Sequence, residues 1–378
     1  MDFSLSEEQE MFRGSVRKYL DGAGQTKIAR EMAKNNMKLL TKTWKGLAQL
    51  GCMGITVKEE YGGAELTTVD QVPVLEELGR ALLPGLYLET VAFAAPMIEK
   101  FGTAEQKEKY LPGIADGSRT ISLAWLEPGK SFNLNDIQMT AKYDEDTMIL
   151  NGSKTLVPEG NLADTYLVLV RSESETDGKG ISFVLVDRND DGVDYRVLQS
   201  MDETRHLTEV NFKNVIVSNS RILGELNRGE DAIEEGLLYL NAALASMMVG
   251  GMDKIVEMCA EYAKIRVQFG QPIGRFQAIK HRIADMKLDL ETARSLSYYA
   301  VWALDEKAED AAVAVNSARA FITEAYLRLA GHGIQIHGGI GVTEEIDCHL
   351  YLKRAQYYQT YLGNSRLYRE KAATALNW

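Results

Sequence analysis

Two glycine-bearing stretches in the last third of the chain invite comparison with known phosphate-binding loops. One is YAKIRVQFGQPIGRFQAIKH, residues 262–281, and the other is GHGIQIHGGIGVTEE, residues 331–345. Glycine allows a backbone to approach a ligand closely. The second stretch has no strand before it and no Lys-Ser/Thr ending, so it is neither a dinucleotide-binding fingerprint nor a P-loop. Taken singly, each stretch is typical of a loop that joins two helices.

A third loop lies in QTYLGNSRLYRE, residues 359–370. Gly363 and Asn364 tolerate left-handed backbone angles, and Asn364 or Ser365 can cap the helix that follows. A loop between helices is a common place for a functional side chain. The residue before the glycine is Leu362, however, and leucine can neither accept nor donate a proton.

The pattern of apolar residues divides the chain into three zones that must position these loops. Residues 1–118 are mostly helical, with Ser4 or Ser6 as a first cap and Thr103 and Gln106 spaced as a capping box. Residues 119–225 predict an antiparallel sheet or barrel, because short β-branched runs alternate with Gly, Asp and Asn. Residues 226–378 contain long helical patterns with short links, which predict a four-helix bundle. The predicted fold class is therefore α+β, with helix predominating.

The predicted strands are RTISLAWLE, TMILNGSKTLV, TYLVLVRS, GISFVLVD and EVNFKNVIV.

Composition restricts the partners. The chain has 42 Lys and Arg against 54 Asp and Glu, a net charge of −12, which argues against nucleic acid as a partner. No apolar run is long enough to span a bilayer, and the first residues are neither a signal peptide nor a transit peptide. We therefore expect no membrane partner and a bacterial cytoplasmic location. The scattered cysteines and histidines lack metal-ligand spacing, so no metal is expected.

A series of motifs extends in order along nearly the whole chain: MDFSLSEEQEMFR, EEYGG, LEELGRAL, FGTAEQKEKYLPGIADG, LEPG, RVQFGQPIGRFQAIKHRIADM and QIHGGIGVTEE. Together they resemble the acyl-CoA dehydrogenase family. The resemblance implies an N-terminal helical domain, a middle β domain and a C-terminal four-helix bundle, as in the zones above. It implies an FAD-dependent α,β-desaturation of an acyl-CoA thioester, with electrons passing to electron-transferring flavoprotein.

In that family each FAD lies across a subunit interface, and the neighbour's bundle holds its ADP half. The resemblance implies that Arg266 binds the pyrophosphate and that Phe269 and Gln277 contact the adenosine. It places Gln335 and the 338–341 loop at the phosphates. The cofactor-binding residues expected in this chain are Arg266, Phe269, Gln277, Gln335, Gly338 and Gly339.

The flavin-facing half departs from the family pattern. Leu126 and Phe132, in LEPGKSFN, replace a Thr that contacts the flavin and a Ser that helps to hold cofactor and substrate. Leu156 and Pro158, in KTLVP, replace a flavin-stacking Trp and a Thr, and proline has no N–H to donate.

The catalytic base is also missing. Leu362 stands where most members have a Glu, and Asn241 stands where a second branch has its Glu. Ala242 replaces an Arg that contacts the CoA chain. Asn364 and Arg366 replace a Thr and a Gln that contact adenine from the flavin's own subunit. No catalytic residue is therefore expected in this chain.

The preferred interpretation resembles the smaller, base-less subunit of two-plus-two heterotetrameric acyl-CoA dehydrogenases, which act on bulky acyl-CoAs such as steroid side chains. FGQPIGRFQAIKH, HGGIGVTEEIDCHLYLKRA and DETR are similar to that branch, including Lys353-Arg354-Ala355 where ordinary members have Arg-Asp-Ala. A catalytic partner subunit would supply the base, the flavin-ring pocket and the acyl-CoA site. The FAD would be shared across the interface.

Two alternatives stay open. One is a self-sufficient homotetrameric dehydrogenase with a displaced base. The carboxylates that could serve are Glu344, Glu345, Asp347, Glu370, Asp202 and Glu203. The other is a non-enzymatic scaffold that binds neither flavin nor acyl-CoA.

Overall fold

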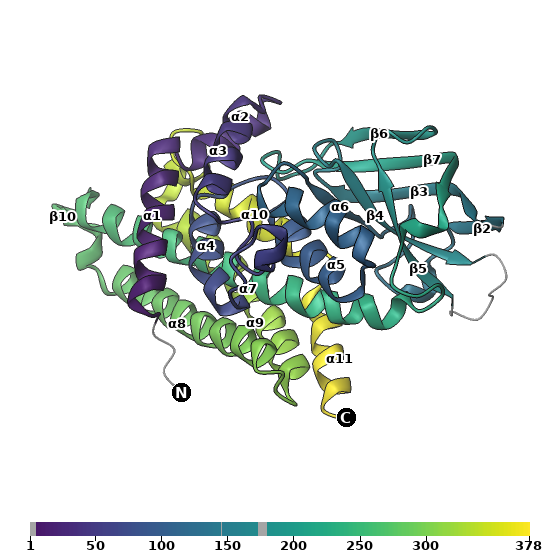
Figure 1. Cartoon of the computed structure of the whole chain (residues 1–378). Helices are drawn as coiled ribbons and strands as arrows, with labels where there is room; N and C mark the ends of the chain where they lie inside the picture. Colours follow the sequence, from purple (N-terminus) through teal and green to yellow (C-terminus); the bar gives the residue numbers. More distant parts are fainter. Residues whose placement is uncertain (1–4, 145, 173–179) are drawn as a thin grey trace. The chain divides into compact units, whose positions relative to one another are not determined.

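The computed structural model describes residues 5–144, 146–172 and 180–378 and divides the chain into two compact units. The bundle unit consists of the chain up to Leu39, Thr68–Leu83 and Asn241–Trp378. The sheet unit consists of Leu40–Thr67 and Pro84–Leu240. Figure 1 follows the chain from the N-terminal helices through the strands to the C-terminal helices. This order confirms the predicted fold class of N-terminal helices, a middle sheet and a C-terminal bundle.

Two of the N-terminal helices, α1 (Glu7–Ala23) and α6 (Ala104–Ala115), begin at the predicted caps. The side chain of Ser6 accepts a hydrogen bond from the backbone N–H of Gln9 at 3.2 Å and forms a complete capping box. Thr103 and Gln106 form the second box. These contacts satisfy backbone N–H groups that the first helical turn leaves free. The helices are α1 Glu7–Ala23, α2 Thr26–Ala33, α3 Lys38–Gln49, α4 Thr68–Arg80, α5 Ala95–Phe101 and α6 Ala104–Ala115, with a π-helix at Tyr87–Ala94.

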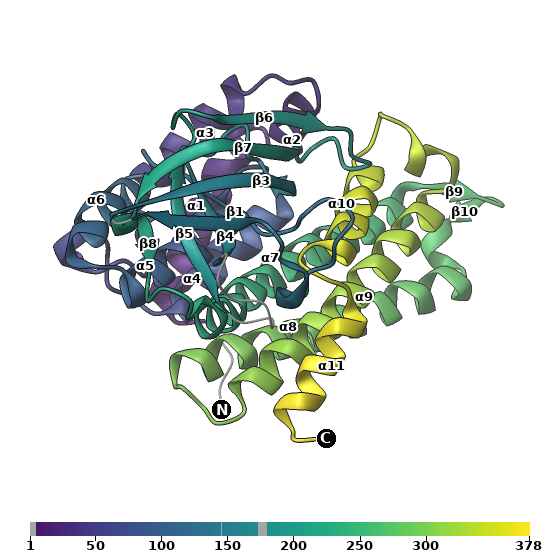
Figure 2. The same ribbon diagram turned by 90° about the vertical axis from the view of Figure 1, so that its right-hand side faces the viewer.

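The sheet unit contains all five predicted strands and three further ones. Its order is β6-β7-β3-β2-β4-β5-β8, with β1 also paired to β4. Figure 2 shows β3, β6 and β7 side by side. The strands are β1 Ile121–Ala124, β2 Thr140–Asp144, β3 Thr147–Pro158, β4 Thr165–Ser172, β5 Ile181–Asp187, β6 Val193–Leu198, β7 Leu207–Ser218 and β8 Ile222–Leu223.

The prediction of an antiparallel sheet needs one correction, because β1 and β2 both run parallel to β4. β1 pairs with the start of β4, at Ile121 and Thr165, and β2 pairs with its end, at Thr140 and Arg171. The two strands are thus successive pieces along one side of β4. The segment that contains LEPGKSFN leaves the sheet between them and returns in the same direction.

The bundle unit contains the long predicted helices. α7 has 37 residues and begins in the sheet unit, and α8 and α9 run side by side in Figure 2. α7 is the single helix of the described residues with the length and apolarity of a membrane span, but 78% of its apolar window is buried inside the protein. The elements are α7 Gly229–Ile265, β9 Val267–Gln268, β10 Gln271–Pro272, α8 Gln277–Asp305, α9 Ala311–His337, α10 Cys348–Thr360 and α11 Ser365–Ala375.

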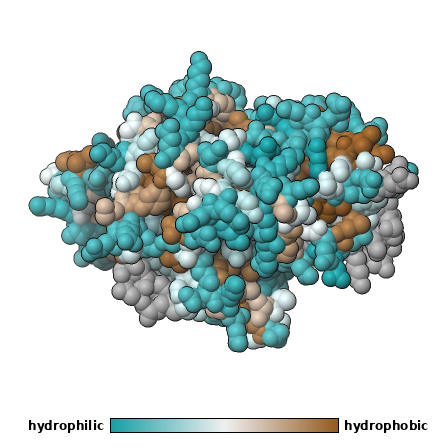
Figure 3. Space-filling view, in the orientation of Figure 1, coloured by the Kyte–Doolittle hydropathy of each residue, from teal (hydrophilic) through white to brown (hydrophobic). Residues whose placement is uncertain are grey.

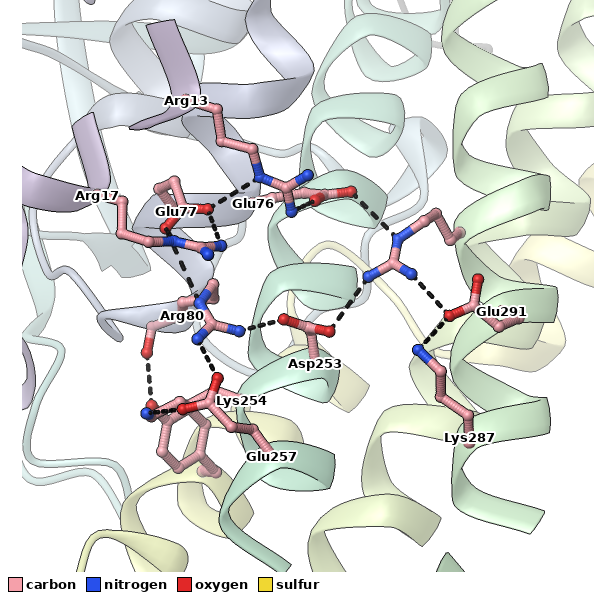
Figure 4. A network of polar contacts seen from close by, with 12 residues as sticks. Arg13, Arg17, Glu76, Glu77, Arg80, Asp253, Lys254, Glu257, Lys287 and Glu291 are labelled. Atoms are coloured by element: carbon pink, nitrogen blue, oxygen red, sulfur yellow. Dashed lines mark hydrogen bonds and ion pairs between the residues drawn. The ribbon is translucent and has the colours of Figure 1, made fainter. Parts of the chain in front are cut away.

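A charged network connects α1, α4, α7 and α8 inside the bundle unit (Figure 4). At its centre the buried carboxylate of Glu77 accepts from Arg17 at 2.6 Å and from Arg13 at 3.1 Å. Arg80 bridges from α4 to Asp253 and to Glu257 on α7. Charges of both signs alternate through this network, so that each buried carboxylate faces at least one guanidinium.

Candidate functional site

The hairpin formed by β9 and β10 presents the first two expected cofactor residues to solvent. Phe269 stands at its turn with a φ of 52° and is 91% exposed. Arg266 is exposed and forms no ion pair with any residue that the structure describes. Figure 3 shows hydrophobic surface at this end of the molecule, where Ile265 and Val267 are also exposed. Both the guanidinium and the phenyl ring are therefore free to contact another molecule.

Gln277 lies next to this hairpin because it is the first residue of α8. The preceding Phe276 packs edge-to-face on Phe269, with ring centroids 6.0 Å apart. The N–H of Ile273 donates to the carbonyl of Arg266 at 2.8 Å, which fixes the return of the hairpin. These contacts bring three of the expected residues onto one short surface segment.

The remaining expected residues stand at the end of α9, and Tyr262 joins this end to the hairpin. The ring of Tyr262 stacks on His337 with centroids 4.4 Å apart. The carbonyl of Tyr262 also accepts the N–H of Arg266 at 2.9 Å. Gln335 is exposed two residues before His337, and Gly338 follows it. The structure thus brings the expected residues of both motifs to one end of the bundle.

Gly338 and Gly339 form an open backbone surface there. Gly338 has a φ of 64° and a ψ of −143°, a conformation that favours glycine. A Cβ added at either glycine would meet no atom of the described chain within 4 Å. Gly339 has no left-handed φ, so this chain's own fold gives no reason for a glycine at that position.

The two possible base positions lie beside one buried cation. Arg319, on α9, donates from Nε to Oδ1 of Asn241 at 3.1 Å. Its terminal nitrogen Nη2 donates to the carbonyl of Tyr361 at 2.9 Å, and Tyr361 immediately precedes Leu362. Sequence reasoning did not single out Arg319. The feature that could have revealed a buried arginine is its position among the mostly small and apolar residues of AAVAVNSARAFITEAY.

The C-terminal loop differs from expectation in one respect. Asn364 does cap α11, since its side chain accepts from the N–H of Leu367 at 3.1 Å, but its φ of −100° is not left-handed. The left-handed residues are Gly363, with a φ of 110°, and Leu362, with a φ of 56°. Leu362 is 5% exposed. Burial of its side chain offsets the cost of a backbone conformation that leucine rarely adopts.

Four of the six carboxylates that were considered as a displaced base have polar partners elsewhere. Asp347 and Glu344 each accept from Arg30, at 2.7 Å. Glu370 stands on α11 as a loose, exposed partner of Arg366, at 3.9 Å. Asp202 is buried in the sheet unit, where it accepts from the N–H of Thr204 at 3.1 Å. None of these contacts involves Leu362 or Asn241.

In the sheet unit, the two segments that the family pattern places at the flavin lie against each other. The N–H of Thr155 donates to the carbonyl of Leu126 at 2.7 Å. A register shift between Lys154 and Val157 bends β3 there and leaves Leu156 with a φ of 51° and an exposure of 41%. Such a bulge re-aims a side chain. The bent backbone exposes the side chain at position 156, but that side chain is a leucine where the family pattern has a tryptophan.

An ion pair and a ring pair support this region from inside. The ammonium of Lys154 donates to Glu127 at 2.8 Å, and burial lowers the pKa of Lys154 to about 8 even though Glu127 opposes the shift. Glu127 also accepts from the N–H of Met139 at 2.9 Å. Phe132 packs edge-to-face on the buried Trp125, with centroids 5.6 Å apart. Apolar rings therefore occupy a segment where the family pattern has a small polar residue.

Comparison with known proteins agrees with this organisation. Three models of acyl-CoA dehydrogenases match the chain: the N-terminal domain at residues 6–118, the middle domain at 122–215 and the C-terminal domain at 227–376. A 3-(aryl)acrylate reductase from Clostridium sporogenes is 30% identical over 372 residues, which cover 96% of this chain and 97% of the relative.

Two solved structures show the same fold. Butyryl-CoA dehydrogenase from Megasphaera elsdenii has a TM-score of 0.91 at 27% identity and covers 100% of both chains. A structure described as the electron transferring flavoprotein of Acidaminococcus fermentans has a TM-score of 0.93 at 28% identity, over 100% of this chain and 99% of that one. The chain belongs to the acyl-CoA dehydrogenase family, a family of FAD-dependent oxidoreductases.

Proposed function

We propose that this chain is the non-catalytic subunit of a heteromeric acyl-CoA dehydrogenase. In this role it binds the ADP half of an FAD whose flavin ring lies in a catalytic partner subunit. The partner supplies the base and the acyl-CoA site, and electron-transferring flavoprotein accepts the electrons. The similarity to the Acidaminococcus structure supports that electron acceptor.

The exposed end of the bundle fits the ADP half of FAD. Arg266 offers an unpaired guanidinium to the pyrophosphate, and such a pair is strong and directional. Phe269 offers an exposed ring to the adenine face. The backbone at Gly338 and Gly339 is open to close approach. We assign the amides of Gln277, which is exposed like the others, to hydrogen bonds with the adenosine.

The flavin-facing segments fit the isoalloxazine ring poorly. An FAD would supply a hydride acceptor for the β-carbon of the substrate, and this chemistry would need hydrogen-bond donors around the ring and a carboxylate at the α-carbon. The side chains of Leu126, Phe132 and Leu156 cannot donate. Pro158 has no N–H, and its carbonyl already accepts from Ser122 at 2.6 Å. We therefore assign no flavin-ring site to this chain.

One observation carries the proposal. Gly339 has no left-handed φ, and a Cβ added there would meet no described residue within 4 Å, while the base position holds a buried leucine. A ligand brought by another subunit explains the glycine, and a base supplied by that subunit explains the leucine. A self-sufficient enzyme would need its own base, and the carboxylates at 344, 347 and 370 pair with arginines instead.

The test is co-expression with the product of a neighbouring dehydrogenase gene. We expect a yellow complex with about half a flavin per chain and turnover only in the complex. Arg266→Ala should lower FAD retention in that complex, whereas Arg366→Ala, also exposed, should leave it unchanged. A full complement of flavin together with turnover from this chain alone would overturn the proposal. A colourless complex that is also unaffected by Arg266→Ala would favour the scaffold alternative.

A further inference from the structure

Arg319 is a buried cation without a carboxylate partner among the described residues. Its side chain is 1% exposed. It donates to Oδ1 of Asn241 at 3.1 Å and to the carbonyls of Tyr358 and Tyr361, at 3.0 and 2.9 Å. A further nitrogen donates to Thr323. Burying a charge without a counter-ion is costly, so these neutral oxygens must provide the compensation.

The compensation comes from the end of a helix. Tyr358 belongs to the last turn of α10, and Tyr361 is its C-cap, where unpaired carbonyls carry a partial negative charge. The ring of Tyr368, on α11, lies 5.0 Å from the guanidinium carbon and adds a cation–π contact. Burial still lowers the pKa of Arg319. The guanidinium therefore has nearly all its N–H groups engaged, but no full negative charge beside it.

These contacts connect three elements through one side chain. Asn241 is on α7, Arg319 is on α9, and the two carbonyls are at the end of α10 and in the loop before α11. The loop that contains Leu362 is thus held from the inside. The guanidinium of Arg319 thus contacts both positions at which members of the family have their base. At position 241 it contacts the side chain of Asn241, and at position 362 it contacts the carbonyl of the preceding residue, Tyr361.

We propose that Arg319 is a positioning residue that fixes the C-terminal loop, and that its charge makes position 241, which holds Asn in this chain, a place where a carboxylate would be an ion-pair partner and not a base. This inference rests on the proposed assignment of positions 241 and 362 as former base positions. A carboxylate at 241 would form a buried ion pair with Arg319 and stay ionised. A general base works best with a pKa near the operating pH, and such an ion pair moves the pKa in the opposite direction. Regaining a base at 241 would therefore require loss of Arg319 as well.

The test uses the full chain without cofactor or partner. Asn241→Asp is nearly isosteric, so it places a carboxylate on the atom that accepts from Arg319 now. The pKa of Asp at 241 is followed by NMR with labelled aspartate, in Arg319, Arg319→Lys and Arg319→Met backgrounds. The melting temperature is measured in parallel between about pH 3 and pH 8, against single variants at position 319.

With Arg319 or Lys at 319, we expect the pKa of the new carboxyl to fall below the ordinary value of about 3.9. The ionised carboxyl then stabilises the fold above about pH 3.9, and this stabilisation is lost as the pH falls through the lowered pKa. With Met at 319 we expect the pKa to rise, because only burial remains. The added stability is then present at low pH and lost as the pH rises through the raised pKa.

This reversal of sign is the signature of the proposed charge effect. If the pKa of the carboxyl at position 241 is the same with Arg, Lys or Met at position 319, the proposed charge effect is wrong. If the Met variant does not fold, the Arg319 and Lys backgrounds suffice, because a pKa at or above the ordinary value in both contradicts the proposal.

The positioning effect has its own readout. Hydrogen exchange of the amides of residues 361–368 should quicken in Arg319→Lys, which cannot reproduce the fork of contacts. Exchange in α1 should not change. Unchanged exchange in the loop would contradict the positioning role. Flavin is absent from every measurement, so failure of the subunit assignment would be seen only in the co-expression experiment.

Discussion

The phenolic hydroxyl of Tyr368 donates a hydrogen bond to the carbonyl of Leu362 at 2.7 Å, so that α11 holds the loop from which it emerges. Leu362 has a φ of 56° at this point, and the left-handed conformation costs an L-amino acid roughly 1–2 kcal/mol. The loop therefore stores strain in its backbone and recovers stability from the burial of the leucine side chain.

This strain predicts an unusual order of stability at position 362. Both Leu362→Ala and Leu362→Gly lose the buried side chain, at a cost of about 2–5 kcal/mol for the alanine variant. Glycine adopts the left-handed conformation freely, so the glycine variant should be more stable than the alanine variant by about 1 kcal/mol. Chemical denaturation of the two variants measures the difference.

Position 359, which is an ordinary helical residue of α10, provides the control. There the order should be the usual one, with Gln359→Ala more stable than Gln359→Gly by about 1 kcal/mol. The same order at both positions would contradict a left-handed Leu362.

A buried cluster in the sheet unit predicts a dependence of stability on pH. Arg205 lies 3.3 Å from Glu159 and 3.2 Å from Glu89, and all three are buried. Burial raises the pKa of Glu159 to about 7, against the attraction of Arg205 and the N–H donors of His206 and Gly85. The folded protein therefore binds a proton at Glu159 more tightly than the unfolded chain does.

A raised pKa means that this contribution is complete below the unfolded value of about 4.3 and is lost as the pH rises through about 7. Glu159→Gln keeps a neutral acceptor of the same shape. It should therefore flatten the melting-temperature profile between these pH values and be relatively more stable at pH 8. Thermal melts across this range test the prediction, and parallel profiles for the two proteins would contradict it.

The network of Figure 4 allows a comparison of buried and exposed carboxylates under one substitution. Glu77 is 2% exposed and faces Arg13 and Arg17, while Glu291 is 47% exposed and faces Lys287 and Arg294. Glu77→Gln removes a buried carboxylate that Arg13 and the half-exposed Arg17 share, although Arg13 keeps Glu76 as a partner at 2.6 Å. The loss of these charged hydrogen bonds should cost about 2 kcal/mol. Glu291→Gln should cost less than about 1 kcal/mol, because solvent screens the pair. Equal losses in urea denaturation would show that burial does not govern this network.

The exposure of Phe269 separates folding from cofactor binding. Phe269→Ala removes a side chain that is 91% exposed, so the melting temperature of the chain alone should stay within about 1 °C. In the co-expressed complex the same change should lower FAD retention. Met11→Ala, which removes another exposed apolar side chain on α1, is the matched control and should affect neither. A large loss of stability in Phe269→Ala would mean that the ring supports the fold.

The sequence allowed prediction of the features that depend on local pattern. The capping boxes at Ser6 and Thr103 were visible because their partners stand three residues away. The strands β2 and β6 were missed, since TAKYD is short and polar and VDYRVL is largely exposed. Their pairing is set by β3, β4 and β7, which are distant in sequence. The parallel pairing with β4 depends on the same distant contacts.

In the candidate site, too, features that depend on local pattern were predicted and features that depend on distant contacts were not. The loop motifs could be recognised from the sequence because their residues are adjacent in the chain. Arg319 was not, because its significance depends on Asn241 and Tyr361, which meet it only in the folded bundle. The left-handed backbone of Leu362 was likewise unpredictable, since the neighbouring Gly363 and Asn364 were the natural candidates for it.

The open surface at Gly339 has a consequence for variation in this chain. Its neighbourhood within the molecule would accept a side chain, so substitutions there should be silent when the protein is expressed and purified alone. Their effect would be felt only by cells that depend on the assembled enzyme. A library of variants at position 339 would therefore report on the ligand bound by the partner. Selection for folding should leave the distribution of variants unchanged, whereas selection for assembly with cofactor should enrich the variants that still accommodate the ligand.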